Sequence, residues 1–327
     1  MGKPLLSFVI PCYRSAHTIG AVVEELTQTL KPRQDEYDHE IILVNDGSPD
    51  HTAEAIKALA ARHPQVVAVD LSRNFGQHSA LMAGFHHVRG DIVICLDDDG
   101  QTPACECFKL IDKVVEGHDI VFAEYGERKQ TAFRNLGSRF NAACNHFFFA
   151  QPRELKANSY FACRRFVVDS ALQYPNPFPY VTGLLFQSVG TYANVRVEHK
   201  ERLEGKSGYN LKKLISLWVN GVTAFSIKPL RLASYVGWLT AAAGFVFALV
   251  TIIRKLFDPA MQAGWASTIS ILLILGGVII TLMGIIGEYI GRIYLSINRY
   301  PQFVVRSVTR GKENEEAHEN DARSMGA

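Results

Sequence analysis

Residues 91–101 read DIVICLDDDGQ: a short apolar run that ends in three consecutive carboxylates, a glycine and a glutamine. An apolar run of this length, bounded by polar turn residues, is typical of a strand buried on both faces of a sheet. Pro103 lies near the start of a predicted helix that extends to about Glu116. A buried strand followed by a polar loop and a helix is the repeating unit of a parallel α/β sheet.

The same unit recurs along the first part of the chain. Further strands are predicted at residues 6–10, 40–44, 66–70 and 120–123. Helices are predicted between them at residues 17–30, 52–62 and 77–88. This alternation predicts an α/β fold with a doubly wound, mostly parallel sheet.

Polar clusters follow the predicted strands at residues 11–15, 45–48, 72–77 and 97–101. In open α/β sheets, ligands bind beyond the carboxyl ends of the strands. Because all these clusters fall at such ends, we expect them to form one site.

The acidic triplet Asp97, Asp98 and Asp99 is the most informative of these clusters. Carboxylates are the ligands that Mg²⁺ and Mn²⁺ prefer, and such metals often bridge to substrate phosphates. If the segment is extended, Asp97 and Asp99 point to one side and Asp98 to the other. The alternative is a solvated acidic turn. Asp46 closes the second strand, where its carboxylate can accept a hydrogen bond from a base or ribose, or cap an Asx turn before Pro49.

The composition narrows the class of protein. Of 327 residues, 48% are hydrophobic and 20% are charged, and the net charge is +2. This balance argues against a nucleic-acid partner, which usually requires a larger basic excess. The six cysteines form no C-x-x-C pair, which indicates free thiols in a reducing compartment. The apolar stretch at residues 5–10 is too short for a signal peptide, so we expect the catalytic part in the cytosol.

Two long uncharged runs follow, at residues 232–253 and 264–287. Each exceeds the roughly 20 helical residues needed to cross a bilayer, so the pair predicts a two-helix transmembrane hairpin; buried soluble helices are the alternative. Basic residues concentrate outside the hairpin, which places the catalytic domain and both termini in the cytoplasm. These residues are Lys212, Lys213, Lys228, Arg231, Arg292, Arg299 and Arg306.

The predicted organisation therefore has four parts. Residues 1–209 form the catalytic domain, residues 232–290 the hairpin, and residues 291–327 a C-terminal segment that is expected to be disordered at its end. Residues 210–231 have apolar side chains at helical spacing, which indicates a helix in the membrane interface or one packed on the domain.

At this point the sequence resembles a known family. The segments at residues 9–13 (VIPCY), 44–48 (VNDGS) and 97–101 (DDDGQ) resemble the signatures of family 2 glycosyltransferases with the GT-A fold. Residues 73–80 (RNFGQHSA) and 287–294 (GEYIGRIY) resemble the polyprenyl-phosphate glycosyltransferases of that family. The resemblance covers about residues 5–310, including the hairpin.

The resemblance implies an enzyme that moves a sugar from a nucleotide-diphosphate sugar to undecaprenyl phosphate, with inversion, for cell-envelope glycans or lipids. It implies a multi-pass protein of the bacterial plasma membrane, whose partners are the sugar donor, the lipid acceptor and the bilayer. The implied cofactor is Mg²⁺ or Mn²⁺, held by Asp97, Asp99 and Gln101. The implied donor-binding residues are Pro11, Tyr13, Asp46, Asp98 and Gln101.

The resemblance also implies a basic stretch that binds phosphate. Its members are Arg202, Lys206, Ser207 and Tyr209. Arg202 and Lys206 are suited to pair with phosphate oxygens of donor or lipid, and with Asp99 they are the implied catalytic residues. Exposed loop charges are the alternative interpretation.

Two departures from the family pattern stand out. Relatives often have an acidic residue shortly after the position of Tyr13, where this chain has Ser15 and Ala16. Relatives also place an Asp near residues 155–159, where only Glu154 is close. A missing base need not prevent transfer, because a phosphate monoester has a second pKa near 6 and is largely a dianion at neutral pH.

Two rival functions remain. A processive polysaccharide synthase shares the GT-A core but carries more spans and a Gln-x-x-Arg-Trp motif, and no Trp here follows an Arg. A non-catalytic, nucleotide-binding membrane scaffold would explain the departures but not the intact triplet. The sequence leaves open the sugar, the donor base and whether the chain forms a homo-oligomer.

Overall fold

The computed structural model describes residues 3–125, 155–198, 228–257 and 264–311. The chain divides into two compact units, one of residues 1–210 and 299–327 and one of residues 211–298. The predicted residues Arg202, Lys206, Ser207 and Tyr209, Glu154 and nearly all of the predicted interface helix lie outside the described residues.

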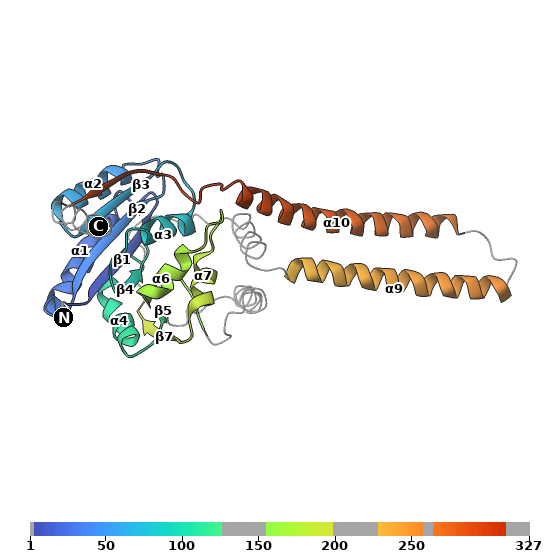
Figure 1. Ribbon diagram of the computed structural model, residues 1–327, viewed down its shortest axis with the longest axis horizontal. Helices are drawn as coiled ribbons and strands as arrows, with labels where there is room; N and C mark the ends of the chain where they lie inside the picture. The colour runs from blue at the N-terminus through green and yellow to red at the C-terminus, as the bar shows by residue number, and fades with distance from the viewer. Residues whose placement is uncertain (1–2, 126–154, 199–227, 258–263, 312–327) are drawn as a thin grey trace, which may run out of the picture. The chain divides into compact units, whose positions relative to one another are not determined.

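The first unit is built on one eight-stranded sheet of order β7-β5-β6-β4-β1-β2-β3-β8 (Figure 1). β1 to β4 run parallel, β5 runs parallel to β7, and β6 and β8 pair antiparallel with their neighbours. The strands are β1 (Leu5–Cys12), β2 (Asp38–Asn45), β3 (Val66–Leu71), β4 (Ile92–Cys95), β5 (Ile120–Tyr125), β6 (Phe161–Arg164), β7 (Tyr192–Val197) and β8 (Val305–Arg310).

Helices cover both faces of this sheet. Phe8 and Ile10 of β1 belong to a buried core that includes residues of α1, α2 and α4. On the other face, α3 packs closely over Val9 and Val44, because Gly84 has no side chain. The helices are α1 (Ile19–Leu30), α2 (Thr52–Arg62), α3 (Gln77–Phe85), α4 (Cys107–Val115), α6 (Arg165–Leu172) and α7 (Val181–Ser188), with 3-10 turns η1 (Lys31–Arg33) and η2 (Ala104–Glu106).

The alternating strands and helices predicted from residues 6 to 123 are confirmed, with end shifts of a few residues. The helix expected after Pro103 begins with the turn η2 before α4. β6, β7 and β8 were not predicted. β6 and β8 pair antiparallel with their neighbours, so the sheet is mostly parallel, as expected, with two antiparallel strands.

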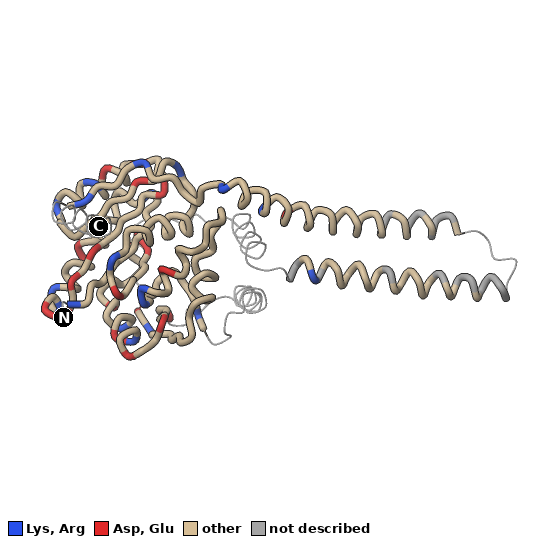
Figure 2. Tube along the Cα trace, viewed as in Figure 1, with Lys and Arg blue, Asp and Glu red and all other residues tan. Residues whose placement is uncertain are grey.

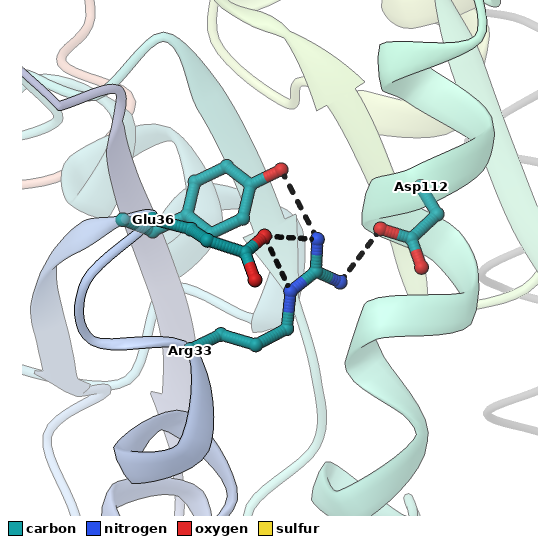
Figure 3. Close-up of polar contacts among 4 residues, drawn as sticks. Arg33, Glu36 and Asp112 are labelled. Carbon is teal, nitrogen blue, oxygen red and sulfur yellow. Dashed lines mark hydrogen bonds and ion pairs between the residues drawn. The ribbon is translucent and has the colours of Figure 1, made fainter.

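Arg33 joins η1 to α4 on the outside of the sheet (Figure 3). Its guanidinium donates to Glu36 at 2.7 Å and to Asp112 of α4 at 2.7 Å. The same group lies 4.5 Å from the ring centroid of Phe108 and 5.1 Å from that of Tyr37. Hydrogen bonds to Glu36 raise the pKa of Arg33 further above its already high value, so the contact persists over the physiological pH range.

The second unit contains α9 (Lys228–Phe257) and α10 (Trp265–Ile297), which contact each other. The charged residues of both helices lie toward their ends, whereas Lys, Arg, Asp and Glu are spread over the first unit (Figure 2). They are Lys228, Arg231, Arg254 and Lys255 in α9 and Glu288 and Arg292 in α10. Within the described residues, one segment, Ile274–Ile297, is long and apolar enough to cross a membrane. The predicted run at residues 232–253 falls within α9, and the run at residues 264–287 falls within α10 except for Gly264, which caps that helix.

After α10 the chain returns to the first unit. β8 adds to the sheet next to β3, with Val308 opposite Val69 and Thr309 opposite Ala68. The chain therefore rejoins the sheet of the first unit after the second unit ends.

Candidate active site at the carboxyl edge of the sheet

The polar loops that follow β1, β2, β3 and β4 contact one another. The main-chain N–H of Arg14 donates to Ser48 Oγ at 3.1 Å, and that of Tyr13 donates to Asp98 Oδ2 at 3.0 Å. The side chain of Gln77, at the start of α3, donates to Asp97 Oδ1 at 3.1 Å. The structure thus brings together the clusters that the sequence placed at one sheet edge.

Asp46 organises the loop that follows β3. Its carboxylate is almost completely buried and accepts hydrogen bonds from the N–H groups of Phe75, at 2.7 Å, and Gly76, at 2.9 Å. Burial raises the pKa of Asp46, although these two bonds counteract the rise. The loops approach so closely that a Cβ on Gly47 would lie 2.2 Å from the carbonyl carbon of Arg73. Asp46 therefore has a structural role in addition to any contact with a nucleotide.

The three carboxylates of the triplet have different partners. Asp98 accepts from the N–H of Tyr13 and from the hydroxyl of Ser15, so it lies against the loop after β1. Asp97 accepts from Gln77 and from the hydroxyl of Ser159, which precedes β6. Asp99 accepts from the N–H of Gln101 at 3.0 Å within its own turn.

Burial dominates the electrostatics of the triplet. It raises the pKa of Asp97 to about 6, with smaller contributions from the neighbouring carboxylates Asp99 and Asp98. Burial also raises the pKa of Asp98. The site therefore concentrates negative charge in a poorly solvated place, which favours a cation or an array of hydrogen-bond donors.

The predicted metal ligands Asp97, Asp99 and Gln101 lie within this loop. Among residues 3–125, 155–198, 228–257 and 264–311, no three His, Cys, Asp or Glu side chains form a ready-made metal shell. The donor set Asp97, Asp99 and Gln101 nevertheless consists of oxygen ligands, and Gln77 and Ser159 orient Asp97 in the way that outer partners orient metal ligands. The residues fit a hard divalent cation.

Pro11 and Tyr13 differ in their exposure. Pro11 is buried within β1, where it lies opposite Val44 of β2. Tyr13 is 45% exposed at the sheet edge, and the guanidinium of Arg14 lies 5.6 Å from its ring centroid. An exposed ring next to a half-buried carboxylate offers a stacking surface for a flat group.

Sequence reasoning missed the hydroxyl and amide donors around the triplet. The hydroxyl of Ser15 donates to Asp98. The hydroxyl of Ser159 donates to Asp97. Gln77 was seen only as part of a motif. The common signal is a short polar side chain close to a strand end, which is too frequent in loops to be decisive.

A second network lies behind the site. Asn45 Nδ2 donates to buried Asp70 Oδ1 at 2.7 Å, and Asn45 Oδ1 accepts from the N–H of Ser48 at 3.1 Å. The Asp70 carboxylate also lies 3.6 Å from Lys57 Nζ and 3.9 Å from a guanidinium nitrogen of Arg306 in β8. The returning strand is thus linked to the loop that carries Asp46.

Comparison with protein families matches both units. Residues 7–170 match the family described as "Glycosyl transferase family 2", and residues 228–293 match the "GtrB C-terminal hairpin". The chain is 34% identical over 323 residues to an undecaprenyl-phosphate 4-deoxy-4-formamido-L-arabinose transferase of Yersinia enterocolitica, covering 96% of each chain. It is 32% identical to an uncharacterized glycosyltransferase, YkcC, of Bacillus subtilis, covering 94% of this chain and 95% of that one.

Solved structures share the fold of the first unit. The mannosyl-3-phosphoglycerate synthase of Rubrobacter xylanophilus superposes with a TM-score of 0.51 at 18% identity, covering 71% of this chain and 75% of that chain. The glucosyl-3-phosphoglycerate synthase of Mycobacterium tuberculosis superposes with a TM-score of 0.50 at 19% identity, covering 68% and 79%. At this identity the likeness shows the fold alone.

Proposed function

The chain belongs to glycosyl transferase family 2, and from this membership we propose that it transfers a sugar from a nucleoside-diphosphate sugar to undecaprenyl phosphate. The family resemblance expected from the sequence is confirmed. The acceptor is supported by relatives of nearly full length that carry undecaprenyl phosphate in their names. The observation that carries the proposal is the sheet edge at which buried Asp46 and half-buried Asp97 and Asp98 are hydrogen-bonded to neighbouring loops.

We propose that the nucleoside of the donor lies at the carboxyl ends of β1 and β2. Asp46, Pro11 and the exposed ring of Tyr13 would line its pocket, and Asp98 would hold the loop that carries Tyr13. This arrangement is supported by the position of ligands beyond the carboxyl ends of strands in open α/β sheets.

Mg²⁺ or Mn²⁺ would be held by Asp97, Asp99 and Gln101. When bound, such an ion neutralises the charge that develops on the departing diphosphate. The chain's own contribution is to orient the ligands: Gln77 and Ser159 fix Asp97, and the turn from Asp99 to Gln101 is closed by a hydrogen bond.

The proposed reaction is an in-line displacement with inversion. An oxygen of the acceptor phosphate attacks the anomeric carbon from the face opposite the diphosphate, and a new C–O bond forms. The old C–O bond breaks, and its electron pair leaves with the diphosphate. The dianionic acceptor has no proton to lose, so positioning and charge stabilisation are sufficient. Arg202 and Lys206, with Ser207 and Tyr209, remain proposed phosphate ligands outside the described residues.

We further propose that α9 and α10 form a two-span hairpin in the bacterial plasma membrane, with the catalytic unit and both termini in the cytoplasm. The match of residues 228–293 to a C-terminal hairpin family and the apolar segment Ile274–Ile297 support this placement. The excess of Lys and Arg outside the hairpin supports the orientation.

Transfer assays on the purified full-length protein test the proposal. Short-chain polyprenyl phosphate is incubated with a panel of radiolabelled nucleotide sugars and Mn²⁺, and a lipid carrying one sugar should appear in the organic phase. Asp99→Asn should abolish the product, whereas the exposed control Asp35→Asn should not. A polymer would indicate a processive synthase. Nucleotide binding without transfer across the panel would indicate a scaffold.

A further inference from the structure

Residues 174–180, between α6 and α7, read YPNPFPY: three aromatic residues, three prolines and no charge (Figure 1). We call this segment the aromatic loop. At its tip, Phe178 is 50% exposed and has a φ of +63°. Neither feature contributes to the site described above, so each requires its own explanation.

Both features of Phe178 are unfavourable in water. A left-handed backbone costs a non-glycine residue about 1 kcal/mol or more. Exposing much of a phenylalanine ring forgoes part of the roughly 1.5–3 kcal/mol that its burial would contribute. Pro177 and Pro179 flank the residue and restrict the backbone on either side, so the exposed position is held in place. A strained, preformed, exposed aromatic side chain indicates a binding function.

The aromatic loop is anchored at both ends. Gln302 Nε2 donates to the carbonyl oxygens of Tyr174, at 2.6 Å, and Asn176, at 2.9 Å. At the other end, the ring of Tyr180 packs edge-on against His78 of α3, with 5.1 Å between the centroids. These contacts keep the loop at a fixed place on the catalytic unit.

Gln302 belongs to the stretch that follows α10, which ends at Ile297. The same stretch is bound to the loop after β3, since Arg73 Nη2 donates to Tyr300 Oη at 3.2 Å and the N–H of Ser72 donates to the carbonyl of Val304 at 2.9 Å. The chain that leaves α10 thus runs between the aromatic loop and the carboxyl end of β3.

The resulting surface combines exposed apolar and cationic side chains. Phe178, Tyr300 and Val304 are 50%, 45% and 44% exposed. Arg73, Arg299 and Arg306 are exposed along the same segments. Tyr is enriched at the boundary between headgroups and hydrocarbon, Phe is among the apolar side chains that interfacial segments bury there, and arginines near a bilayer are attracted to anionic lipids. We call these six residues the return surface.

We propose that the return surface lies on the bilayer interface, with Phe178 inserted among the lipid headgroups. This inference rests on the proposed function, because it takes α10 as a membrane helix. Continuity supports it: Arg299 and Tyr300 follow α10 directly, so a spanning α10 delivers this surface to headgroup depth. The return surface borders the carboxyl end of β3, because Tyr300 and Val304 are bound to the loop that follows this strand.

Photo-crosslinking of the full-length protein in nanodiscs of phosphatidylethanolamine and phosphatidylglycerol tests this placement. Phe178→p-benzoylphenylalanine should give a phospholipid adduct by mass spectrometry. Phe166→p-benzoylphenylalanine is the matched control, since Phe166 of α6 is 46% exposed but lies outside the return surface. The adduct should be several-fold more abundant at position 178. Ile280→p-benzoylphenylalanine in α10 provides the positive control.

Three outcomes would overturn the proposal: equal adducts at positions 166 and 178, no adduct at 178 while position 280 reacts, or a crosslink from 178 to a second copy of the chain. Activity separates this inference from the proposed function. Phe178→Ser should raise the KM for long-chain undecaprenyl phosphate in nanodiscs several-fold but leave kcat with a short-chain acceptor in detergent unchanged. A lipid adduct without transfer to any polyprenyl phosphate would contradict the function alone.

Discussion

At the scale of single residues, the site is a set of carboxylates whose hydrogen-bond donors come from distant parts of the chain. Asp97 accepts hydrogen bonds from the side chains of Gln77 and Ser159. Asp98 accepts one from the hydroxyl of Ser15. The sequence showed the carboxylates because three in a row at a strand end are unusual. It could not show the donors, since which hydroxyl reaches which carboxylate depends on how β6 and β1 are placed beside β4.

Asp97 destabilises the metal-free protein. An aspartate whose pKa is about 6 in the folded state, against 3.8 unfolded, binds its proton more tightly when folded. This tighter proton binding stabilises the folded state at low pH. The stabilisation is lost as the pH rises from about 4 to 6, and it stays absent at higher pH. Asp97→Asn should raise the metal-free stability by about 2 kcal/mol at pH 7.5 and by much less at pH 4, while abolishing transfer. Thermal unfolding at both pH values checks this, and an equal gain at both would contradict it.

Ser159 orients Asp97 and should matter through that contact. Ser159→Ala removes one of its hydrogen-bond donors. Loss of an outer-shell partner typically weakens metal affinity or activity about 10–100-fold. We expect the Mn²⁺ concentration for half-maximal activity to rise by about tenfold, with Ser159→Thr close to wild type because the hydroxyl is retained. A variant with unchanged Mn²⁺ dependence would show that the hydroxyl has no such role.

At the scale of elements, local pattern explains which parts were predictable. β1 to β4 are buried on both faces, so they appear as unbroken apolar runs, and α1 and α2 show helical spacing. β7 and β8 are mostly half-buried or exposed, and β6 has only four residues. The order of polar and apolar residues in these three strands resembles that of a loop. What makes them strands is pairing with partners far away in the sequence.

The contact between α3 and the sheet depends on a missing side chain. A Cβ on Gly84 would lie 2.5 Å from Val9 Cγ1 and 3.1 Å from Val44 Cγ2. Overpacking of this kind costs about 1–3 kcal/mol, so Gly84→Ala should lower the melting temperature. Gly20→Ala in α1 is the control, because nothing lies within 4 Å of its Cβ position. There the gain in helix propensity, roughly 0.5–1 kcal/mol, should raise stability, and the opposite order of the two variants would refute the packing argument.

At the scale of the whole molecule, the two units are joined twice, and β8 forms the second connection. The two long uncharged runs predicted two long helices, and the structure has them as α9 and α10. That these helices cross a membrane stays a prediction. The return of the chain to the sheet was not predictable, since the pairing of β8 with β3 joins residues more than 200 positions apart. Local sequence carries no record of such a contact.

The pairing of β8 can be broken selectively. The N–H of Gly311 donates to the carbonyl of Val66, so by the two-residue period of a strand the N–H of Thr309 also faces β3 and that of Val308 faces away. Thr309→Pro should therefore release β8, lower the melting temperature and reduce transfer to long-chain acceptor. Val308→Pro, on the open edge, should be tolerated better. Indistinguishable effects of the two prolines would argue against this register.

The late position of β8 in the chain has a consequence for biosynthesis. The ribosome makes β3 early, yet the strand that covers its edge emerges only after both helices of the second unit. At about 5–20 residues per second, β3 stays uncovered for roughly 10–50 s, and an uncovered strand edge invites pairing with other chains. Nascent chains arrested before Val305 has been added should therefore recruit chaperones or aggregate. Nascent chains long enough for Gly311 to have emerged from the ribosome should not. The catalytic sheet is therefore completed only after both helices of the second unit have been synthesised.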